Sequence, residues 1–104
     1  MGIEKLRRKI QAGGPVAFAV YTGTVTVDPA NASSGHEKVD TDVTITGAAV
    51  GDIVVLEPPD ALEDDLVPAG AVVVSANTVT VKLYAGAAVN GASRTWRYLW
   101  VDLT

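Results

Sequence analysis

Residues 51–81 read GDIVVLEPPDALEDDLVPAGAVVVSANTVTV, and this stretch decides the fold class. Two valine-rich runs, residues 53–56 and 71–74, flank a loop that carries three prolines. A third run, residues 78–83, alternates apolar and polar side chains directly after Asn77. Short β-branched runs punctuated by Pro, Gly and Asn are typical of antiparallel strands. The stretch therefore predicts packed β-structure.

Outside this stretch the same pattern continues. Residues 37–46 alternate cleanly between valine or isoleucine and aspartate or threonine, which predicts a half-exposed strand. Residues 51–56 have little polar content and are expected to form a central strand, whereas Pro68 places residues 67–75 at an edge or a bulge. The last strand, residues 93–103, is largely apolar on both faces, so it is expected either to be sandwiched or to place one face on a subunit interface. Six or seven such strands predict an all-β fold, an antiparallel β-sandwich or a jelly-roll-like barrel.

The strand expected over residues 16–27 changes its apolar parity near Gly23. A glycine within a strand often marks a bulge or bend that redirects the side chains. The alternative is that the first half of the strand is buried on both faces.

Residues 1–14 are expected to form a basic N-terminal helix or arm with a hinge, and residues 15–104 the β-sandwich domain. Ile3, Leu6 and Ile10 stand three and four positions apart and form one apolar stripe. A helix this short is marginal in water, so it must pack on its own domain or on another copy. Glycines and a proline at residues 13–15 end the helix.

The charge of the chain is divided unevenly. Four cationic side chains and Glu4 give residues 1–12 a charge of +3, so the total of −4 leaves −7 on residues 13–104. This arm fits an acidic docking surface, a nucleic acid or a neighbouring subunit, and an ordinary solvated terminus is the simplest alternative. Nucleic acid is the weakest choice because the body repels phosphate and the arm lacks aromatic residues. The candidate contact residues are Lys5, Arg7, Arg8 and Lys9.

Several functional classes are disfavoured by composition. The chain has no cysteine and a single histidine, His36, so a zinc site or a catalytic triad has few possible members. The acidic residues 57–65 lack the spacing and the central glycine of an EF-hand loop, and are better explained as a solvated loop. No apolar run approaches the ~20 residues of a membrane span. We therefore expect no enzyme activity, no cofactor, no metal site and no membrane partner.

Three aromatic residues alternate along the last expected strand: Trp96, Tyr98 and Trp100. On an exposed face they would form a platform on which a sugar ring can stack. The favoured interpretation is that they belong to the core or to a subunit interface. The first option defines an alternative function, a carbohydrate-binding or receptor-binding module.

A family resemblance rests on several segments in a fixed order. AVGDIVV at residues 49–55 is followed by two prolines and Leu62, then by Gly-Ala at residues 70–71, SANTVTV at residues 75–81 and ASRTWRYLW at residues 92–100. In this order the segments resemble the small head-fibre and capsid-decoration proteins of tailed bacteriophages. The resemblance covers about residues 43–101, and the basic arm has no counterpart in it.

The resemblance implies a non-enzymatic structural protein on the outer surface of a virion. Such proteins form homotrimers on the capsid lattice and cement neighbouring capsomers, so the expected partners are the major capsid protein and further copies of the chain. Because the chain has no long shaft, decoration or cement protein suits it better than fibre. The subunit-interface candidates are Ile3, Leu6, Ile10, Trp96, Tyr98 and Trp100.

Overall fold

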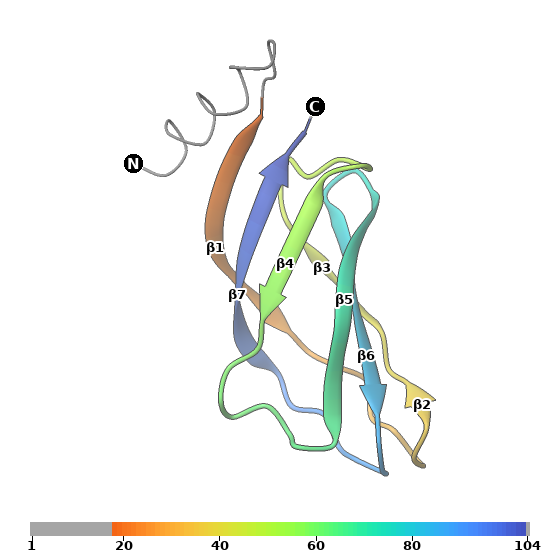
Figure 1. Ribbon diagram of the computed structural model, residues 1–104. Helices are drawn as coiled ribbons and strands as arrows, with labels where there is room; N and C mark the ends of the chain where they lie inside the picture. The colour runs from red at the N-terminus through yellow and green to blue at the C-terminus, as the bar shows by residue number, and fades with distance from the viewer. Residues whose placement is uncertain (1–17, 104) are drawn as a thin grey trace.

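A computed structural model describes residues 18–103, which form seven β-strands (Figure 1). The predicted helix or arm over residues 1–14 lies outside the described residues. No helix within residues 18–103 is long and apolar enough to cross a membrane. The strands are β1 (Ala19–Val27), β2 (Glu37–Lys38), β3 (Thr41–Thr44), β4 (Ile53–Glu57), β5 (Leu66–Ser75), β6 (Thr78–Ala85) and β7 (Arg94–Asp102).

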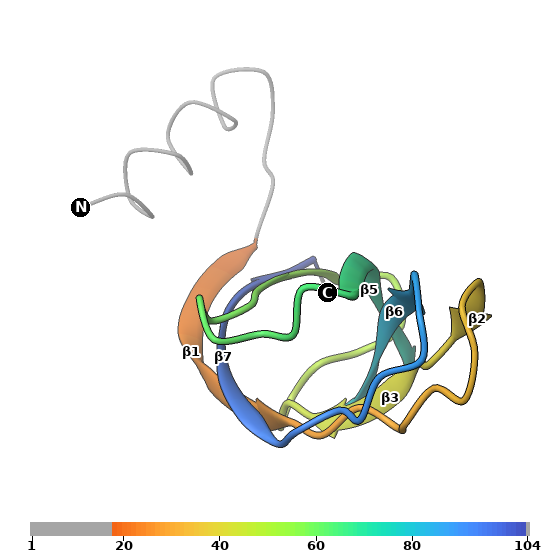
Figure 2. The same cartoon turned by 90° about the horizontal axis from the view of Figure 1, so that it is seen from below.

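The strands form two antiparallel sheets. β7 lies at the centre of the first sheet, between β1 and β4. β6 is the centre of the second sheet, with β5 along one side and β3 and β2 along successive parts of the other. The end-on view shows the strands of both sheets around a shared interior (Figure 2). The predicted all-β antiparallel sandwich is confirmed.

The core fills the space between the sheets. The two largest contributors, Trp96 and Trp100, come from β7 and are only 1% and 7% exposed. Small aliphatic side chains from the opposite sheet pack against them, which is how a chain with few aromatic residues fills its interior. The largest of these side chains that are fully buried are Leu83, Val79 and Val81 of β6.

The β5–β6 hairpin agrees closely with the sequence prediction. Asn77 adopts a φ of 66°, in the left-handed region that turns require and asparagine tolerates. Its side-chain oxygen also accepts a hydrogen bond from the Gly47 N–H at 2.7 Å, which joins the turn to the loop after β3. The ladder between β5 and β6 shifts register between Pro68 and Gly70, and β5 pairs only with β6. The predicted edge position and bulge are both present.

The predicted central position of residues 51–56 is wrong, because within residues 18–103 β4 pairs only with β7 and lies at the edge of its sheet. Val54 points into the core, whereas Ile53 and Val55 are 51% and 55% exposed. The run is apolar on both faces of the strand, yet residues 18–103 cover only one of these two faces. Apolar content alone therefore gave the wrong position.

The other predicted strands need smaller adjustments. Residues 37–46 alternate as expected, with Val43 and Ile45 buried, but are split into β2 and β3. β1 carries no bulge at Gly23, since its register with β7 is continuous from Ala19 to Val27. A Cβ at Gly23 would lie 2.7 Å from Tyr98 Oη, so this position makes room for the tyrosine ring.

Candidate interaction face

The outer surface of the β1–β7–β4 sheet carries a continuous group of aliphatic side chains. Val101 of β7 pairs with Val20 of β1 on one side and with Ile53 of β4 on the other. Two positions earlier along β7, Leu99 pairs with Val55 of β4. Neighbouring residues in a ladder share a face, as do alternate residues along a strand. We call Val20, Ile53, Val55, Leu99 and Val101 the apolar face. Its exposed members are Ile53, Val55 and Leu99, the last 39% exposed, while Val20 and Val101 are half-buried.

A polar row borders the apolar face at one end. Arg97 of β7 pairs with Glu57 of β4, and Arg97 Nε donates to Glu57 Oε1 at 2.7 Å. Both side chains are well exposed, so this ion pair contributes little to stability. A shallow groove of about 540 Å³ runs over this end, lined by Thr22, Gly23, Thr24, Val55, Glu57, Arg97, Tyr98 and Leu99. The groove shares Val55 and Leu99 with the apolar face and adds the polar side chains of the neighbouring row.

The outer surface of the second sheet has a different character. Thr80 of β6 donates to Asp42 of β3 at 2.6 Å, and both side chains face outward. Farther along β6, the Tyr84 hydroxyl lies 3.0 Å from Nδ1 of His36. Lys82 is exposed between these two pairs. Val67 and Val72 of β5, which pair with Tyr84 and Thr80, are also exposed on this surface. The surface is therefore mixed, with its polar groups already hydrogen-bonded to each other.

The aromatic interface candidates lie on the inner side of β7. Trp96 and Trp100 are buried in the core of a single chain, and the Tyr21 ring stacks on Trp100 with 4.6 Å between ring centroids. Tyr98 is half-buried and packs across Gly23. No flat indole face is therefore exposed for a sugar or a neighbouring subunit. The exposed side chains come from the opposite parity of the same strand and from β4.

Two sets of residues remain: the site candidates within residues 1–14, and the exposed residues of the apolar face. Ile3, Leu6, Ile10 and the cationic Lys5, Arg7, Arg8 and Lys9 all lie outside the described residues. The apolar face residues Ile53, Val55 and Leu99 were not chosen from the sequence. The signal that could have found them is the alternation of the last strand, whose Leu99 and Val101 share the parity opposite to the tryptophans.

The buried carboxylate of Asp52, just before β4, is hydrogen-bonded to the end of β7. Asp52 Oδ1 accepts from the Leu103 N–H, and Oδ2 accepts from the Ala49 N–H and the Trp100 indole N–H, each at 3.0 Å. The hydrogen bond from Leu103 lowers the pKa of Asp52 most, those from Ala49 and Trp100 lower it further, and burial opposes them. Asp52 thus stays ionised near neutral pH and orients the Trp100 ring. Its role is structural.

The histidine and its neighbours are engaged in local contacts. His36 has a φ of 61° and its ring faces Tyr84. Glu37 accepts the Ser33 N–H at 2.9 Å, and Asp40 accepts the Leu83 N–H at 3.1 Å between β2 and β3. Within residues 18–103, no group of three or more His, Cys, Asp or Glu side chains is arranged to hold a metal ion.

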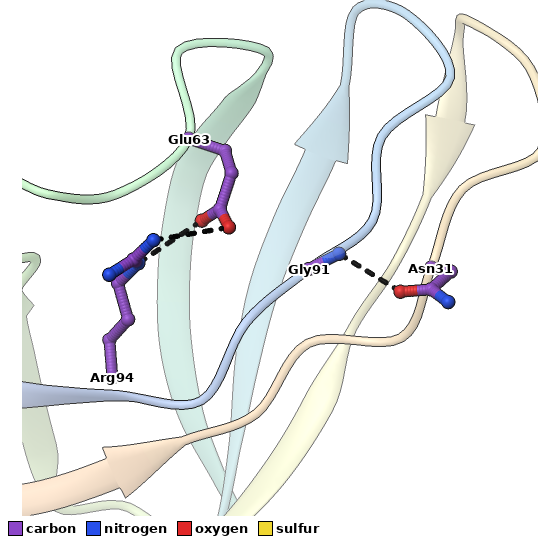
Figure 3. Close-up of polar contacts among 4 residues, drawn as sticks. All are labelled: Asn31, Glu63, Gly91 and Arg94. Atoms are coloured by element: carbon purple, nitrogen blue, oxygen red, sulfur yellow. Dashed lines mark hydrogen bonds and ion pairs between the residues drawn. The ribbon is translucent and has the colours of Figure 1, made fainter.

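The acidic loop between β4 and β5 is anchored to β7. Glu63 pairs with Arg94 through two contacts of 3.3 and 3.4 Å (Figure 3). The hydrogen bond from Arg94 is the main cause of a lowered pKa for Glu63, and burial opposes it. At the same end, Asn31 Oδ1 accepts the Gly91 N–H at 2.9 Å and joins two further loops (Figure 3). These contacts fix loop positions.

No family model, curated protein or solved structure matches the chain.

Proposed function

We propose that this chain is a structural, non-enzymatic protein that forms a homotrimer and decorates the outer surface of a phage capsid. The observation that supports the proposal is the apolar face, which residues 18–103 leave uncovered and whose central positions on β7 and β4 are aliphatic. Exposed apolar surface of this kind marks an interaction site in soluble proteins. The segments between residues 43 and 101 that resemble head-fibre and decoration proteins supply the viral context.

Covering the apolar face gives a direct reason for assembly. Full burial of an aliphatic side chain stabilises by roughly 1.5–3 kcal/mol, so covering a half-exposed one contributes about 1 kcal/mol. Ile53, Val55 and Leu99 are exposed by between 39% and 55%. Each subunit of a trimer repeats this gain.

The proposed partner outside the trimer is the major capsid protein. Lys5, Arg7, Arg8 and Lys9 are the proposed contacts with it, and no nucleic acid or membrane is involved. A trimer presents three basic arms to a repeating lattice. Many weak contacts then give strong attachment through effective concentration. The proposed location is the outer surface of the virion.

The test is to mix the purified protein with capsids that lack it and to image the particles. We expect density at regular lattice positions with three-fold symmetry. A variant lacking residues 1–12 should occupy fewer positions, because its cationic contacts are gone. The matched comparison is Asp60→Ala, which changes an exposed loop residue and should bind normally. Undecorated capsids at saturating protein would contradict the proposal.

A further inference from the structure

We propose that residues 3–10 of one subunit dock on the apolar face of the next subunit. This inference rests on the proposed homotrimer and names the contact that would hold it together. The occupant is a segment of this chain from a second copy. The site is the outer surface of the β1–β7–β4 sheet at Ile53, Val55 and Leu99.

The symmetry of a trimer favours two different surfaces in contact. A face that packs against the same face of a second copy produces a two-fold pair, whereas a three-fold ring needs one patch to meet a different patch. The chain supplies two such apolar patches. One is the apolar face, and the other is the stripe that the sequence predicts for Ile3, Leu6 and Ile10. Docking the stripe on the face covers both.

Charge favours contact between the arm of one copy and the body of another. Residues 1–12 carry +3 and residues 13–104 carry −7, so an arm is attracted to any body of this protein. The stripe brings its aliphatic side chains to the face while Lys5, Arg8 and Lys9 stand off it and remain available for other contacts. This arrangement also leaves cationic side chains directed away from the sheet, as capsid attachment requires.

The connecting segment is long enough to reach a second copy. β1 starts at Ala19, which pairs with Asp102, so the arm joins the body at the Val20–Val101–Ile53 end of the apolar face. The seven residues 11–17 span up to roughly 23 Å when extended. Three strands spaced about 4.8 Å apart make a sheet only about 10 Å wide between its outer strands. The arm can therefore pass the edge of its own sheet.

The absence of cysteine makes a direct cross-linking test possible. A nitrogen-15-labelled Leu6→Cys chain is mixed in denaturant with an unlabelled Leu99→Cys chain, refolded and mildly oxidised. Mass spectrometry then identifies disulfides between labelled and unlabelled peptides. The matched control replaces Leu99→Cys by Val72→Cys, because Val72 is 41% exposed on the second sheet and Leu99 is 39% exposed. The mass of the unmodified protein is measured in parallel.

We expect the 6–99 disulfide to form between different chains in at least tenfold higher yield than the 6–72 disulfide. Equal yields would overturn the inference. A Leu6→Cys, Leu99→Cys double variant that closes only within one chain would also overturn it. A trimeric mass without the 6–99 disulfide rejects the arm contact but leaves the proposed homotrimer standing, whereas a monomeric mass rejects both. If Leu6→Cys impairs folding, Ile10→Cys replaces it in the same design.

Discussion

The outer surfaces of the two sheets carry different kinds of side chain at their central positions. On the β5–β6–β3 side, Asp42 and Thr80 hydrogen-bond to each other across neighbouring strands. On the β1–β7–β4 side, the equivalent central positions are occupied by Leu99 and Val55. Both surfaces are made by antiparallel strands of similar length. The difference shows that strand formation does not require the aliphatic side chains on the first surface.

The comparison separates the side chains that stabilise a single chain from those that are available for contacts between chains. The inner residues of both sheets already form a continuous core around Trp96 and Trp100. The apolar face lies outside that core and stabilises a single chain only slightly. We infer that its side chains serve contacts between chains. The following predictions are ordered from the largest expected effect to the smallest.

The largest effect is expected when a charge is placed on each surface in turn. Val55→Lys and Val67→Lys change the same residue type on edge strands, at 55% and 52% exposure. Val55→Lys should weaken self-association by about 100-fold or more at each contact, because burying an unpaired ammonium costs several kcal/mol. Val67→Lys should leave association unchanged. Sedimentation equilibrium measures both, and equal effects would show that the two surfaces do not differ as described.

The two faces of β7 should differ sharply in what they contribute to folding. Trp96→Ala should lower the free energy of unfolding by about 3–5 kcal/mol through loss of packing. The Trp96 indole N–H has no hydrogen-bond partner within residues 18–103, so packing accounts for the whole cost. Leu99→Ala, three positions along the strand, should cost less than about 1 kcal/mol in the monomer. Urea unfolding at low protein concentration gives both values, and a comparable loss for Leu99→Ala would place it in the core.

A smaller effect is expected at the contact between β1 and Tyr98. Gly23→Ala should cost about 1–3 kcal/mol, because the added Cβ lies within 2.9 Å of three atoms of the Tyr98 ring and hydroxyl. The ring must shift, and Tyr98 also lines the groove beside the apolar face. The double variant Gly23→Ala, Tyr98→Ala should cost less than the sum of the two single changes. Additive losses in thermal unfolding would mean that the two residues are independent.

The smallest effect concerns pH and the Asp52 contact beneath the apolar face. The folded pKa of Asp52 lies below its ordinary value of 3.8, so its stabilising contribution is complete above that value and is lost as pH falls through the folded pKa. Asp52→Asn should therefore destabilise the protein at pH 7 and differ less from the unmodified protein at pH 3. The exposed Asp60→Asn serves as the control. Chemical unfolding at the two pH values measures the difference, and a constant gap would contradict this role for the carboxylate.

Local features of the fold were readable from the sequence. Asn77 turns the β5–β6 hairpin, Pro68 interrupts the ladder, and residues 37–46 alternate as written. Each of these depends on the conformational preference of one residue or on a two-residue period. Such preferences act over a few positions and survive in the folded chain.

Features that depend on residues far apart in the sequence could not be predicted from it. The aliphatic run of β4 looked like a central strand, but its neighbours in the sheet are set by β7, some 45 residues later. Because both parities of the last strand are apolar, nothing local indicates that Trp96 points inward and Leu99 outward. The Asp52–Trp100 hydrogen bond joins residues 48 positions apart and has no motif. The interaction face had to be found in the structure.

The central claim is that the apolar face is covered in the native protein while the outer surface of the second sheet is not. It is tested most directly by the alkylation rates of two single-cysteine variants, Leu99→Cys and Val72→Cys, in a chain that otherwise has no thiol. The two sites are 39% and 41% exposed in one chain, so a solitary molecule gives similar rates. We predict much slower alkylation at position 99 under native conditions and equal rates after unfolding. Similar native rates at the two positions would contradict the account.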